Sequence, residues 1–330
     1  MKIGVFGATG LVGQHMLTCL AEAGYPVGCV VAAASDRSVG LRAPYGAQEV
    51  RVISVEALLA AQVDYVLFAV EAELSREWAP RFVEGGAVVI DNSSAWRMDP
   101  QVPLVIPEVN FDTVAAHRLI ANPNCSTIQL VAALAPIHRV NPVVSLRVAT
   151  YQAVSGSGIR GLNQLREERQ GRVPRDPFYG HPIEGNCLPH CDAFEPSGYT
   201  KEEMKLVNET KKILRAPQLR VSATAVRVPV EVGHSEVAYF ECAQPITPGQ
   251  VQQLLSRAEG IKLVDDPQRA LYPTPLAAVG QDRVLVGRVR QDLASPTQGI
   301  SFWVVADNLR KGAAANAVQI LRRLQSPTDC

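Results

Sequence analysis

Apolar and polar positions in the first 125 residues follow two alternating patterns. Short, nearly continuous apolar runs, typical of strands buried on both faces of a parallel sheet, are separated by segments with helical spacing of apolar residues. The apolar runs predict strands at residues 2–6, 27–34, 51–53, 64–70, 87–91 and 119–121. The helical spacing predicts helices at residues 11–23, 55–61 and 74–83. Strands that alternate with helices predict an α/β domain.

The rest of the chain has a different pattern. Strands are predicted at residues 145–153, 221–228, 236–242, 284–290 and 300–306. Helices are predicted at residues 127–134, where Pro136 is expected to break the pattern, at 160–170, after a Thr200/Glu203 capping box, and at 313–324. Residues 172–196 lack periodicity and predict a long loop, a candidate oligomer contact. We expect a second, α+β domain built on a mixed sheet.

These patterns divide the chain into two expected domains. Residues 1–126, completed by a C-terminal helix within 308–330, form the first, and residues 127–307 form the second. The length of 330 residues, with 47% hydrophobic residues, is enough for two domains with sizeable cores.

Charge and cysteine content exclude several classes of protein. The 32 basic and 32 acidic residues balance, which argues against a nucleic-acid or anionic-membrane partner. No apolar run reaches the roughly 18 residues of a membrane span, and the N-terminus lacks the layout of a signal peptide. The seven scattered cysteines indicate reduced thiols and a cytoplasmic protein. The spacing of Cys187, Cys191 and nearby histidines matches no common zinc pattern, so we expect no metal.

A glycine-rich turn follows the first strand and precedes the first helix. Gly7, Gly10 and Gly13 form a G-x-x-G-x-x-G pattern, the layout of a dinucleotide-binding βαβ unit. The alternative is a tight turn without a nucleotide. The second strand ends at Ser35-Asp36-Arg37-Ser38. Here Asp36 suits the ribose of NAD, Arg37 with two serines favours the 2′-phosphate of NADP, and a solvated turn is the alternative.

Cys125 lies between an Asn-Pro-Asn turn and an apolar run, where a helix is expected to begin at Ser126 or Thr127. The N-terminal end of a helix favours negative charge, and therefore the nucleophilic thiolate. The alternative is a small buried hydrophobic side chain.

Three further sets of polar residues have a functional and a structural interpretation. Arg97 follows a strand and either binds an anion or caps a loop. Glu202 and Lys205 share one helix face, where a surface salt bridge is the alternative. His234 follows a glycine near Arg227 and is either catalytic or structural.

Eight stretches, in collinear order over almost the whole chain, resemble the aspartate-β-semialdehyde dehydrogenase family. They are GATGLVG (7–13), ASDRSVG (34–40), NSSAWRMD (92–99), NPNCST (122–127), QAVSGSG (152–158), GYTKEEMK (198–205), RVPVEVGHSE (227–236) and DNLRKGAA (307–314). The resemblance implies a Rossmann-type first domain, a catalytic and dimerisation domain, and a homodimer.

The resemblance also implies a role for each matching residue. The catalytic residues would be Cys125 as nucleophile, His234 as general acid/base and Gln152, which orients the substrate. Substrate would be bound by Arg227 at the α-carboxylate, by Glu202 at the amino group, and at phosphate by Arg97, Lys205 and Asn124. The NADP site would be lined by Gly7, Thr9, Gly10, Leu11, Val12, Ser35, Arg37, Ser38, Ser155, Gly156 and Asn308.

The reaction implied by the resemblance is the reversible, NADPH-dependent reductive dephosphorylation of L-aspartyl-4-phosphate to L-aspartate-4-semialdehyde. It belongs to the biosynthesis of lysine and diaminopimelate, threonine, methionine and isoleucine. The thiolate of Cys125 displaces phosphate to form a thioester, hydride gives a thiohemiacetal, and its collapse releases the semialdehyde. A guanidinium such as that of Arg227 matches a carboxylate with two parallel hydrogen bonds, which lysine cannot do.

Two other functions stay open at this point. An N-acetyl-γ-glutamyl-phosphate reductase shares fold and chemistry, but its acylated amine has no use for Glu202, and its cysteine loop normally has glycine before the cysteine. An inactive paralogue acting as a binding protein is expected to lose Cys125 or His234, and both are present.

Overall fold

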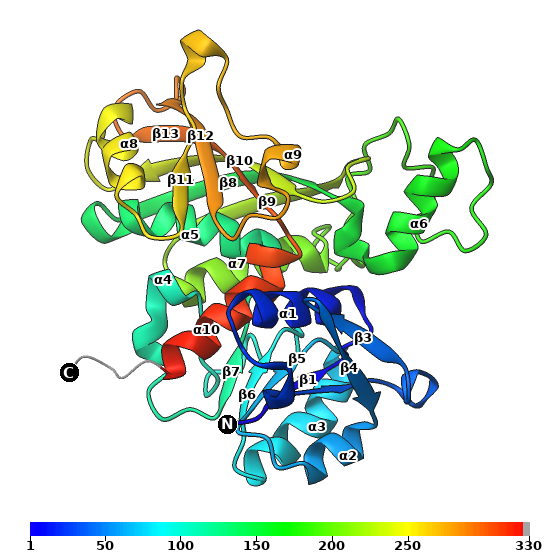
Figure 1. Cartoon of the computed structure of the whole chain (residues 1–330). Helices are drawn as coiled ribbons and strands as arrows, with labels where there is room; N and C mark the ends of the chain where they lie inside the picture. The colour runs from blue at the N-terminus through cyan, green and yellow to red at the C-terminus, as the bar shows by residue number, and fades with distance from the viewer. Residues whose placement is uncertain (326–330) are drawn as a thin grey trace. The chain divides into compact units, whose positions relative to one another are not determined.

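The computed structural model describes residues 1–325, which form two compact units (Figure 1). The first unit consists of Met1–Asn124 and the segment that starts at Ala313, and the second is Cys125–Gly312. The chain therefore changes unit at the Asn124–Cys125 and Gly312–Ala313 bonds. Residues 326–330, which the expected first domain includes, lie outside the described residues.

The first unit contains a seven-stranded sheet with the order β3-β4-β2-β1-β5-β6-β7 (Figure 1). Its strands are β1 (Ile3–Phe6), β2 (Val30–Ala33), β3 (Arg42–Tyr45), β4 (Gln48–Ile53), β5 (Tyr65–Phe68), β6 (Val88–Asp91) and β7 (Leu119–Ala121). All neighbours are parallel except β3, which pairs antiparallel with β4. The sequence did not predict β3, because this four-residue edge strand contains Pro44 and has no clear apolar run.

Helices pack on both faces of this sheet. On one face α1 (Leu11–Glu22) and α10 (Ala315–Gln325) form a core that includes Leu17 and Leu321. On the other face α2 (Val55–Ala60) and α3 (Ala72–Glu84) form a core that includes Leu58 and Phe82. The short α4 (Pro107–Asn110) precedes β7. Burial of both faces explains the continuous apolar strands and confirms the predicted Rossmann-type α/β architecture.

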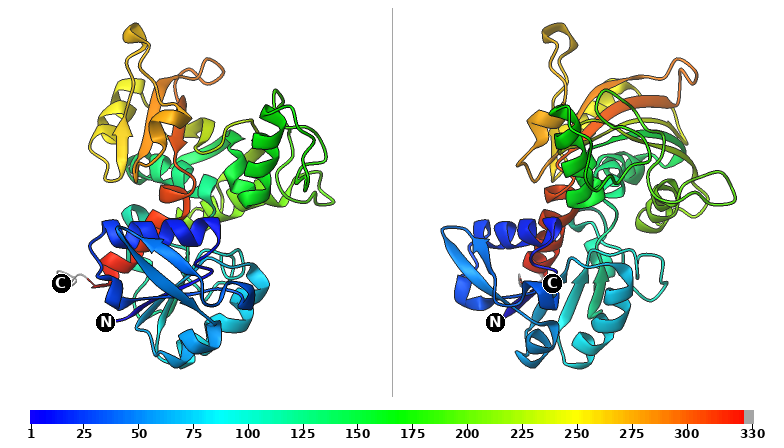
Figure 2. Two further views of the ribbon diagram at one scale, coloured as in Figure 1. Left: turned by 45° about the vertical axis from the view of Figure 1, so that its right-hand side comes forward. Right: turned by 90° about the vertical axis from the view of Figure 1, so that its right-hand side faces the viewer.

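The second unit contains a six-stranded mixed sheet with the order β11-β12-β13-β10-β8-β9. Figure 2 shows the ribbon from two further directions. Its strands are β8 (Val143–Gln152), β9 (Arg220–Arg227), β10 (His234–Cys242), β11 (Ile261–Leu263), β12 (Val284–Gln291) and β13 (Gly299–Ala306). Two neighbouring pairs, β8 with β9 and β11 with β12, are parallel, and the others are antiparallel. The predicted mixed sheet is confirmed.

One face of this sheet is covered by α5 (Cys125–Val140), α7 (Lys201–Ile213) and α8 (Pro248–Ser256). The core on this face includes Leu130 and Leu134 of α5 with Phe240 and Phe302 of the sheet. The short α9 (Pro275–Ala278) packs on the opposite face, where Ala278 contacts Leu285 and Val305. The helix α6 (Gly158–Arg169) precedes the long loop of residues 172–196.

The structure corrects three local predictions. The helix α5 continues through Pro136 to Val140, because its side chains from Ser126 to Ala135 are buried and packing outweighs the roughly 3 kcal/mol cost of an interior proline. Residues 27–29 form a 3₁₀ turn before β2. A π-helical turn at Arg310–Ala314 precedes α10, which starts two residues later than predicted. None of the helices within residues 1–325 is long and apolar enough to cross a membrane.

Candidate functional site

Cys125 is the first residue of α5 and the first residue of the second unit. The helix therefore begins one residue before the predicted start, and the thiol stands at its N-terminal end. Gly312 packs directly against it: a Cβ built on Gly312 would lie 2.9 Å from the Cys125 Cβ. Any side chain at position 312 would collide with Cys125, so glycine is required there. Asn124, the preceding residue, is buried and ends the first part of the other unit.

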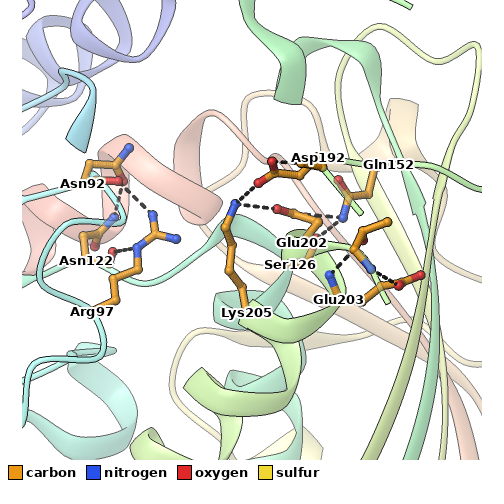
Figure 3. A network of polar contacts seen from close by, with 11 residues as sticks. Asn92, Arg97, Asn122, Ser126, Gln152, Asp192, Glu202, Glu203 and Lys205 are labelled. Carbon is orange, nitrogen blue, oxygen red and sulfur yellow. Dashed lines mark hydrogen bonds and ion pairs between the residues drawn. The ribbon is translucent and has the colours of Figure 1, made fainter. Parts of the chain in front are cut away.

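Gln152 lies beside the first turn of α5. Its amide Nε2 donates to the Ser126 hydroxyl at 3.0 Å and to Oε1 of Glu202 at 3.2 Å (Figure 3). Gln152 is the last residue of β8, and Glu202 lies in the first turn of α7. Three separate elements thus converge on the residue that follows Cys125.

Lys205 is paired with two carboxylates. Its Nζ lies 3.0 Å from Oε2 of Glu202 and 2.8 Å from Oδ2 of Asp192 (Figure 3). Burial acts against the charge of Lys205, but the Glu202 and Asp192 carboxylates raise its pKa above the ordinary value. The salt bridge between Glu202 and Lys205, which was the alternative to substrate binding, is present. It is not a surface salt bridge, because Glu202 is buried. The contact of Asp192 with Lys205 was not predicted from the sequence, because Asp192 lies in the aperiodic loop of residues 172–196.

Arg227 and His234 pack against one another around Gly156. A Cβ on Gly156 would lie 2.8 Å from Nη1 of Arg227 and 3.2 Å from Nε2 of His234. Nη1 of Arg227 donates to the Ala153 carbonyl at 2.7 Å, whereas its Nε is buried without a hydrogen-bond partner. Among the residues that the structure describes, Arg227 has no ion-pair partner. A buried cation in this state is suited to receive an anion from outside the protein.

His234 is the first residue of β10 rather than a loop residue, and its side chain is fully buried. Its Nδ1 accepts a hydrogen bond of 3.0 Å from the Ala153 N–H, so the proton of the neutral ring is on Nε2, which has no partner. Burial, and then the charge of Arg227, lower the pKa of His234 to about 3. The ring is thus a neutral donor at Nε2.

One helix connects His234 to the cysteine. The backbone carbonyl of His234 faces Nε2 of Gln129 at 3.4 Å. Gln129 is four residues after Cys125, so both project from the same side of α5. His234 therefore lies about one helical turn along the face that carries Cys125.

Ser155 and Asn308 form a second support for this region. Asn308 Nδ2 donates to the Ser155 hydroxyl at 2.9 Å, and its Oδ1 accepts from the Gly233 N–H at 2.9 Å. Gly233 has φ of +100°, a conformation that favours glycine. Asn308 thus fixes the turn that leads into His234.

In the first unit, Arg97 joins two loops. Its Nε donates to the Asn122 carbonyl at 3.0 Å and its Nη2 to the Asn92 carbonyl at 2.8 Å (Figure 3). Asn122 also donates to Oδ1 of Asn92 at 2.7 Å. Arg97 therefore has the structural, loop-capping role that the sequence left open, whatever else it binds.

The glycine turn has the close backbone approach that a dinucleotide-binding loop needs. Gly7 has φ of +91°, and a Cβ on Gly13 would lie 2.0 Å from the Gly7 carbonyl oxygen. The start of α1 has no side-chain cap and no acidic residue in its first turn, so the N–H groups at Leu11 and Val12 face no carboxylate of their own helix. This end of α1 suits a pyrophosphate.

Next to this turn lie the polar residues after β2. Ser35 and Arg37 are exposed, and Ser38 accepts a hydrogen bond of 3.3 Å from the Thr9 hydroxyl. Arg37 has no ion-pair partner among the described residues, so its guanidinium is available to a ligand.

Comparisons with known proteins agree on one family. Residues 2–117 match the model "Semialdehyde dehydrogenase, NAD binding domain", and residues 134–311 match "Semialdehyde dehydrogenase, dimerisation domain". The chain is 45% identical over 333 residues to the aspartate-semialdehyde dehydrogenase of Aquifex aeolicus, covering 98% of this chain and 97% of that one. It is 46% identical over 331 residues to aspartate-semialdehyde dehydrogenase 2 of Vibrio cholerae, covering 98% and 97%.

Solved structures give the same result. Aspartate semialdehyde dehydrogenase II of Vibrio cholerae, complexed with ASA, superposes with a TM-score of 0.94 at 44% identity, covering 99% of this chain and 98% of that chain. The Candida albicans enzyme with NADP has a TM-score of 0.76 at 26% identity, covering 98% of each chain.

Proposed function

The chain belongs to the aspartate-semialdehyde dehydrogenase family, and on this premise we propose that it interconverts L-aspartyl-4-phosphate and L-aspartate-4-semialdehyde with NADPH. The reaction supplies a precursor of lysine and diaminopimelate, threonine, methionine and isoleucine. The match of residues 134–311 to a dimerisation domain supports a homodimer. A reaction that depends on a free thiol suits the reducing cytoplasm.

The observation that carries this proposal is the state of Arg227. Its guanidinium is buried, has an unpartnered Nε and pairs with no carboxylate of the described chain. Burying a charge without a counter-ion is costly, so such a residue is best explained by a ligand that brings one. The α-carboxylate of aspartate semialdehyde matches a guanidinium in shape and charge.

The group around Lys205 suits the substrate ammonium. Glu202 and Asp192 bring two negative charges beside the one positive charge of Lys205. The substrate ammonium would add positive charge beside Glu202, which is the residue expected to bind the amino group. An acylated amine has no charge to offer there, which favours aspartate semialdehyde over an N-acetylated substrate.

Covalent chemistry is assigned to Cys125. Its thiolate attacks the carbonyl carbon of the acyl phosphate, a C–S bond forms, and the C–O bond to phosphate breaks with its electron pair on the leaving phosphate. The helix start at Cys125 favours the thiolate. Gln152, fixed between Ser126 and Glu202, orients the substrate beside the thiol.

His234 would act on the oxygen that gains negative charge when the thiolate attacks. Its Nε2–H is free to donate, and a preorganised donor lowers the energy of such an oxyanion. Because Nδ1 already accepts from Ala153, the resting ring supports the acid half of the expected acid/base role.

The phosphate is assigned to Lys205 together with Arg97 and Asn124. Lys205 offers a compact charge, but it must leave or share Asp192 to contact a phosphate. Arg97 would keep its two loop hydrogen bonds and add a second positive charge. Because Asp192 competes with phosphate for the Lys205 ammonium, the Asp192–Lys205 pair would lower the affinity for phosphate.

We assign the cofactor to the first unit, whose family model is an NAD-binding domain, and we propose NADP as the preferred form. When bound, the nicotinamide supplies or accepts the hydride. Gly7, Gly10, Leu11 and Val12 would hold the pyrophosphate at the start of α1, and Thr9, Ser35, Arg37 and Ser38 would hold the 2′-phosphate. Ser155, Gly156 and Asn308 would line the nicotinamide side.

An assay of the purified protein tests the function. Aspartate semialdehyde, NADP and phosphate should together give NADPH, detected by its absorbance, and omission of phosphate should stop turnover. N-acetylglutamate semialdehyde is the matched control substrate and should react far more slowly. Turnover of the acetylated substrate alone would contradict the proposal and support the N-acetyl-γ-glutamyl-phosphate reductase alternative. No turnover of either would support an inactive paralogue.

A further inference from the structure

We propose that Glu236 is a positioning residue: it is a neutral carboxylic acid that holds Gln129 and, through Gln129, the start of β10 at His234. The proposal rests on the function proposed for Cys125 and His234. It gives a role to a buried acidic side chain that the mechanism above does not use.

Glu236 lies between the apolar core and the reacting groups. Along β10 the side chains that face α5 are, in order toward the strand's start, Ala238, Glu236 and His234. Glu236 is in register with Thr150 on β8 and with Val304 on β13. Glu236 and Thr150 are therefore neighbouring buried polar side chains, two residues along β10 from His234.

The carboxyl group of Glu236 is fully buried, and neither oxygen meets a donor in hydrogen-bond geometry. The side chains of Gln129 and Ser126 nevertheless lie close enough to lower the pKa of the acid. Oε1 of Gln129 is also buried and without a partner. If Glu236 is ionised, its two oxygens and Oε1 of Gln129 are three buried acceptors without a partner, whereas a protonated acid supplies one O–H to this group.

Electrostatics favours the same protonation state. Burial raises the pKa of Glu236 well above its ordinary value, and the charge of Glu202 on α7 acts in the same direction, against Gln129 and Ser126. His234, two positions earlier on the same face of β10, is neutral and adds no charge. A negative charge here would also disfavour a thiolate at Cys125.

A protonated Glu236 completes a chain of hydrogen bonds. In the proposed arrangement its O–H donates to Oε1 of Gln129, and Nε2 of Gln129 faces the His234 carbonyl at 3.4 Å. Gln129 also shares its helix face with Cys125. The acid thereby fixes the distance between the nucleophile's helix and the strand of the proton donor, and it adds no charge.

Infrared difference spectroscopy tests the protonation state directly. At neutral pH, wild type minus Glu236→Gln should show the carbonyl stretch of a protonated carboxylic acid. Glu203→Gln is the matched control, because Glu203 is a buried side chain whose oxygens accept from the N–H groups of Thr200 and Ala225 at 2.7 and 2.9 Å. Its difference spectrum should show only carboxylate bands. A carboxylate band, with no acid band, for Glu236 would overturn the proposal. The infrared measurement requires no enzymatic activity, so it tests the protonation state of Glu236 independently of the proposed function.

Steady-state kinetics tests the positioning role in folded variants with unchanged circular dichroism. Glu236→Gln keeps shape and a donor and should keep kcat within about threefold, whereas Glu236→Leu should lose about 10- to 100-fold in kcat with KM little changed. Gln129→Leu should reproduce that loss without removing the acid band. An equal loss in Glu236→Gln and Glu236→Leu would mean that charge is required, and wild-type kcat in either leucine variant would mean that the link does nothing. Either result overturns the proposal.

Discussion

The surroundings of Arg227 and of Lys205 differ although both side chains belong to the same unit and both are expected to bind an anionic group of the substrate. Lys205 is paired with two carboxylates of the protein, Glu202 and Asp192. Arg227 has no ion-pair partner in the described chain, and its Nε has no hydrogen-bond partner. The first cation is neutralised before any ligand arrives, and the second is not.

This difference shows what each cation can contribute to binding. A buried, unpaired guanidinium gains most of its counter-ion interaction from the ligand, so its removal should weaken binding strongly. A paired ammonium must exchange one partner for another, so only the difference between the two interactions appears in the affinity. We therefore expect Arg227 to dominate substrate affinity and Lys205 to adjust it.

The largest effect is expected for Arg227→Ala. Loss of a buried charge pair costs about 2–5 kcal/mol, so kcat/KM for aspartate semialdehyde should fall roughly 30- to 1000-fold or more, mainly through KM. Arg227→Lys keeps the charge but not the fork and should recover only part of the loss. The KM for NADP serves as the control and should be unchanged. An unaltered substrate KM in Arg227→Ala would remove the carboxylate assignment.

Arg37 extends the comparison to an exposed cation without a partner in the first unit. Loss of a charge-assisted hydrogen bond to the 2′-phosphate costs roughly 1.5–3 kcal/mol. Arg37→Ala should therefore raise the KM for NADP about ten- to hundredfold and leave that for NAD nearly unchanged. Equal effects on both cofactors would assign the preference to Asp36 or to another residue.

For Lys205→Ala we expect a rise of about tenfold or less in the KM for phosphate, because the lysine is already paired. Arg97→Ala should act in the same direction. If both side chains bind one phosphate, the double variant should deviate from additivity by about 0.5–3 kcal/mol. A Lys205→Ala enzyme with unchanged phosphate dependence would restrict Lys205 to its salt bridges.

The opposite direction is expected for Asp192→Asn. Removing the competing carboxylate frees Lys205, so the KM for phosphate should fall a few-fold. Asp176→Asn is the control, because Asp176 pairs with Arg160 on a helix surface away from this group and should be silent. A higher KM for phosphate in Asp192→Asn would show that Asp192 orients Lys205 instead of competing for it.

The smallest effect concerns His234, whose pKa is lowered to about 3 by burial and then by the charge of the neighbouring Arg227. Arg227→Gln should raise this pKa, but burial should keep it below the ordinary value. The unfolded histidine titrates near 6.5. As pH falls from about 6.5 toward 3, the unfolded chain binds a proton first and stability is lost. The variant should lose less over that window, as measured by denaturant unfolding at pH 7 and pH 5 with NMR of the imidazole. Identical His234 titration in both proteins would contradict the coupling.

Features set by neighbouring residues were predictable from sequence. The Thr200/Glu203 capping box requires only a four-residue segment, and both of its hydrogen bonds are present in α7. The glycine turn and its place after β1 are equally local. The apolar periods predicted most strands of both sheets, because strand burial follows directly from side-chain polarity, but they missed the short β3 and β11.

Features set by packing or by distant contacts were not predictable. The continuation of α5 past Pro136 depends on what its buried face packs against. The contact of Asp192 with Lys205 depends on the path of a loop without periodicity, in which Asp192 has φ of +68°. The absence of an ion-pair partner for Arg227 among the described residues and the clash that Gly312 avoids with Cys125 exist only in three dimensions.

The most direct test of the account is to trap the covalent intermediate. Aspartate semialdehyde and NADP without phosphate should convert Cys125 into an aspartyl thioester, visible by mass spectrometry of the acid-quenched protein in the peptide that contains Cys125. Addition of phosphate should discharge it with release of aspartyl phosphate. Cys125→Ala should carry no adduct and have no turnover while still binding NADP. Near-normal turnover by Cys125→Ala, or an adduct on another cysteine in its place, would contradict the account.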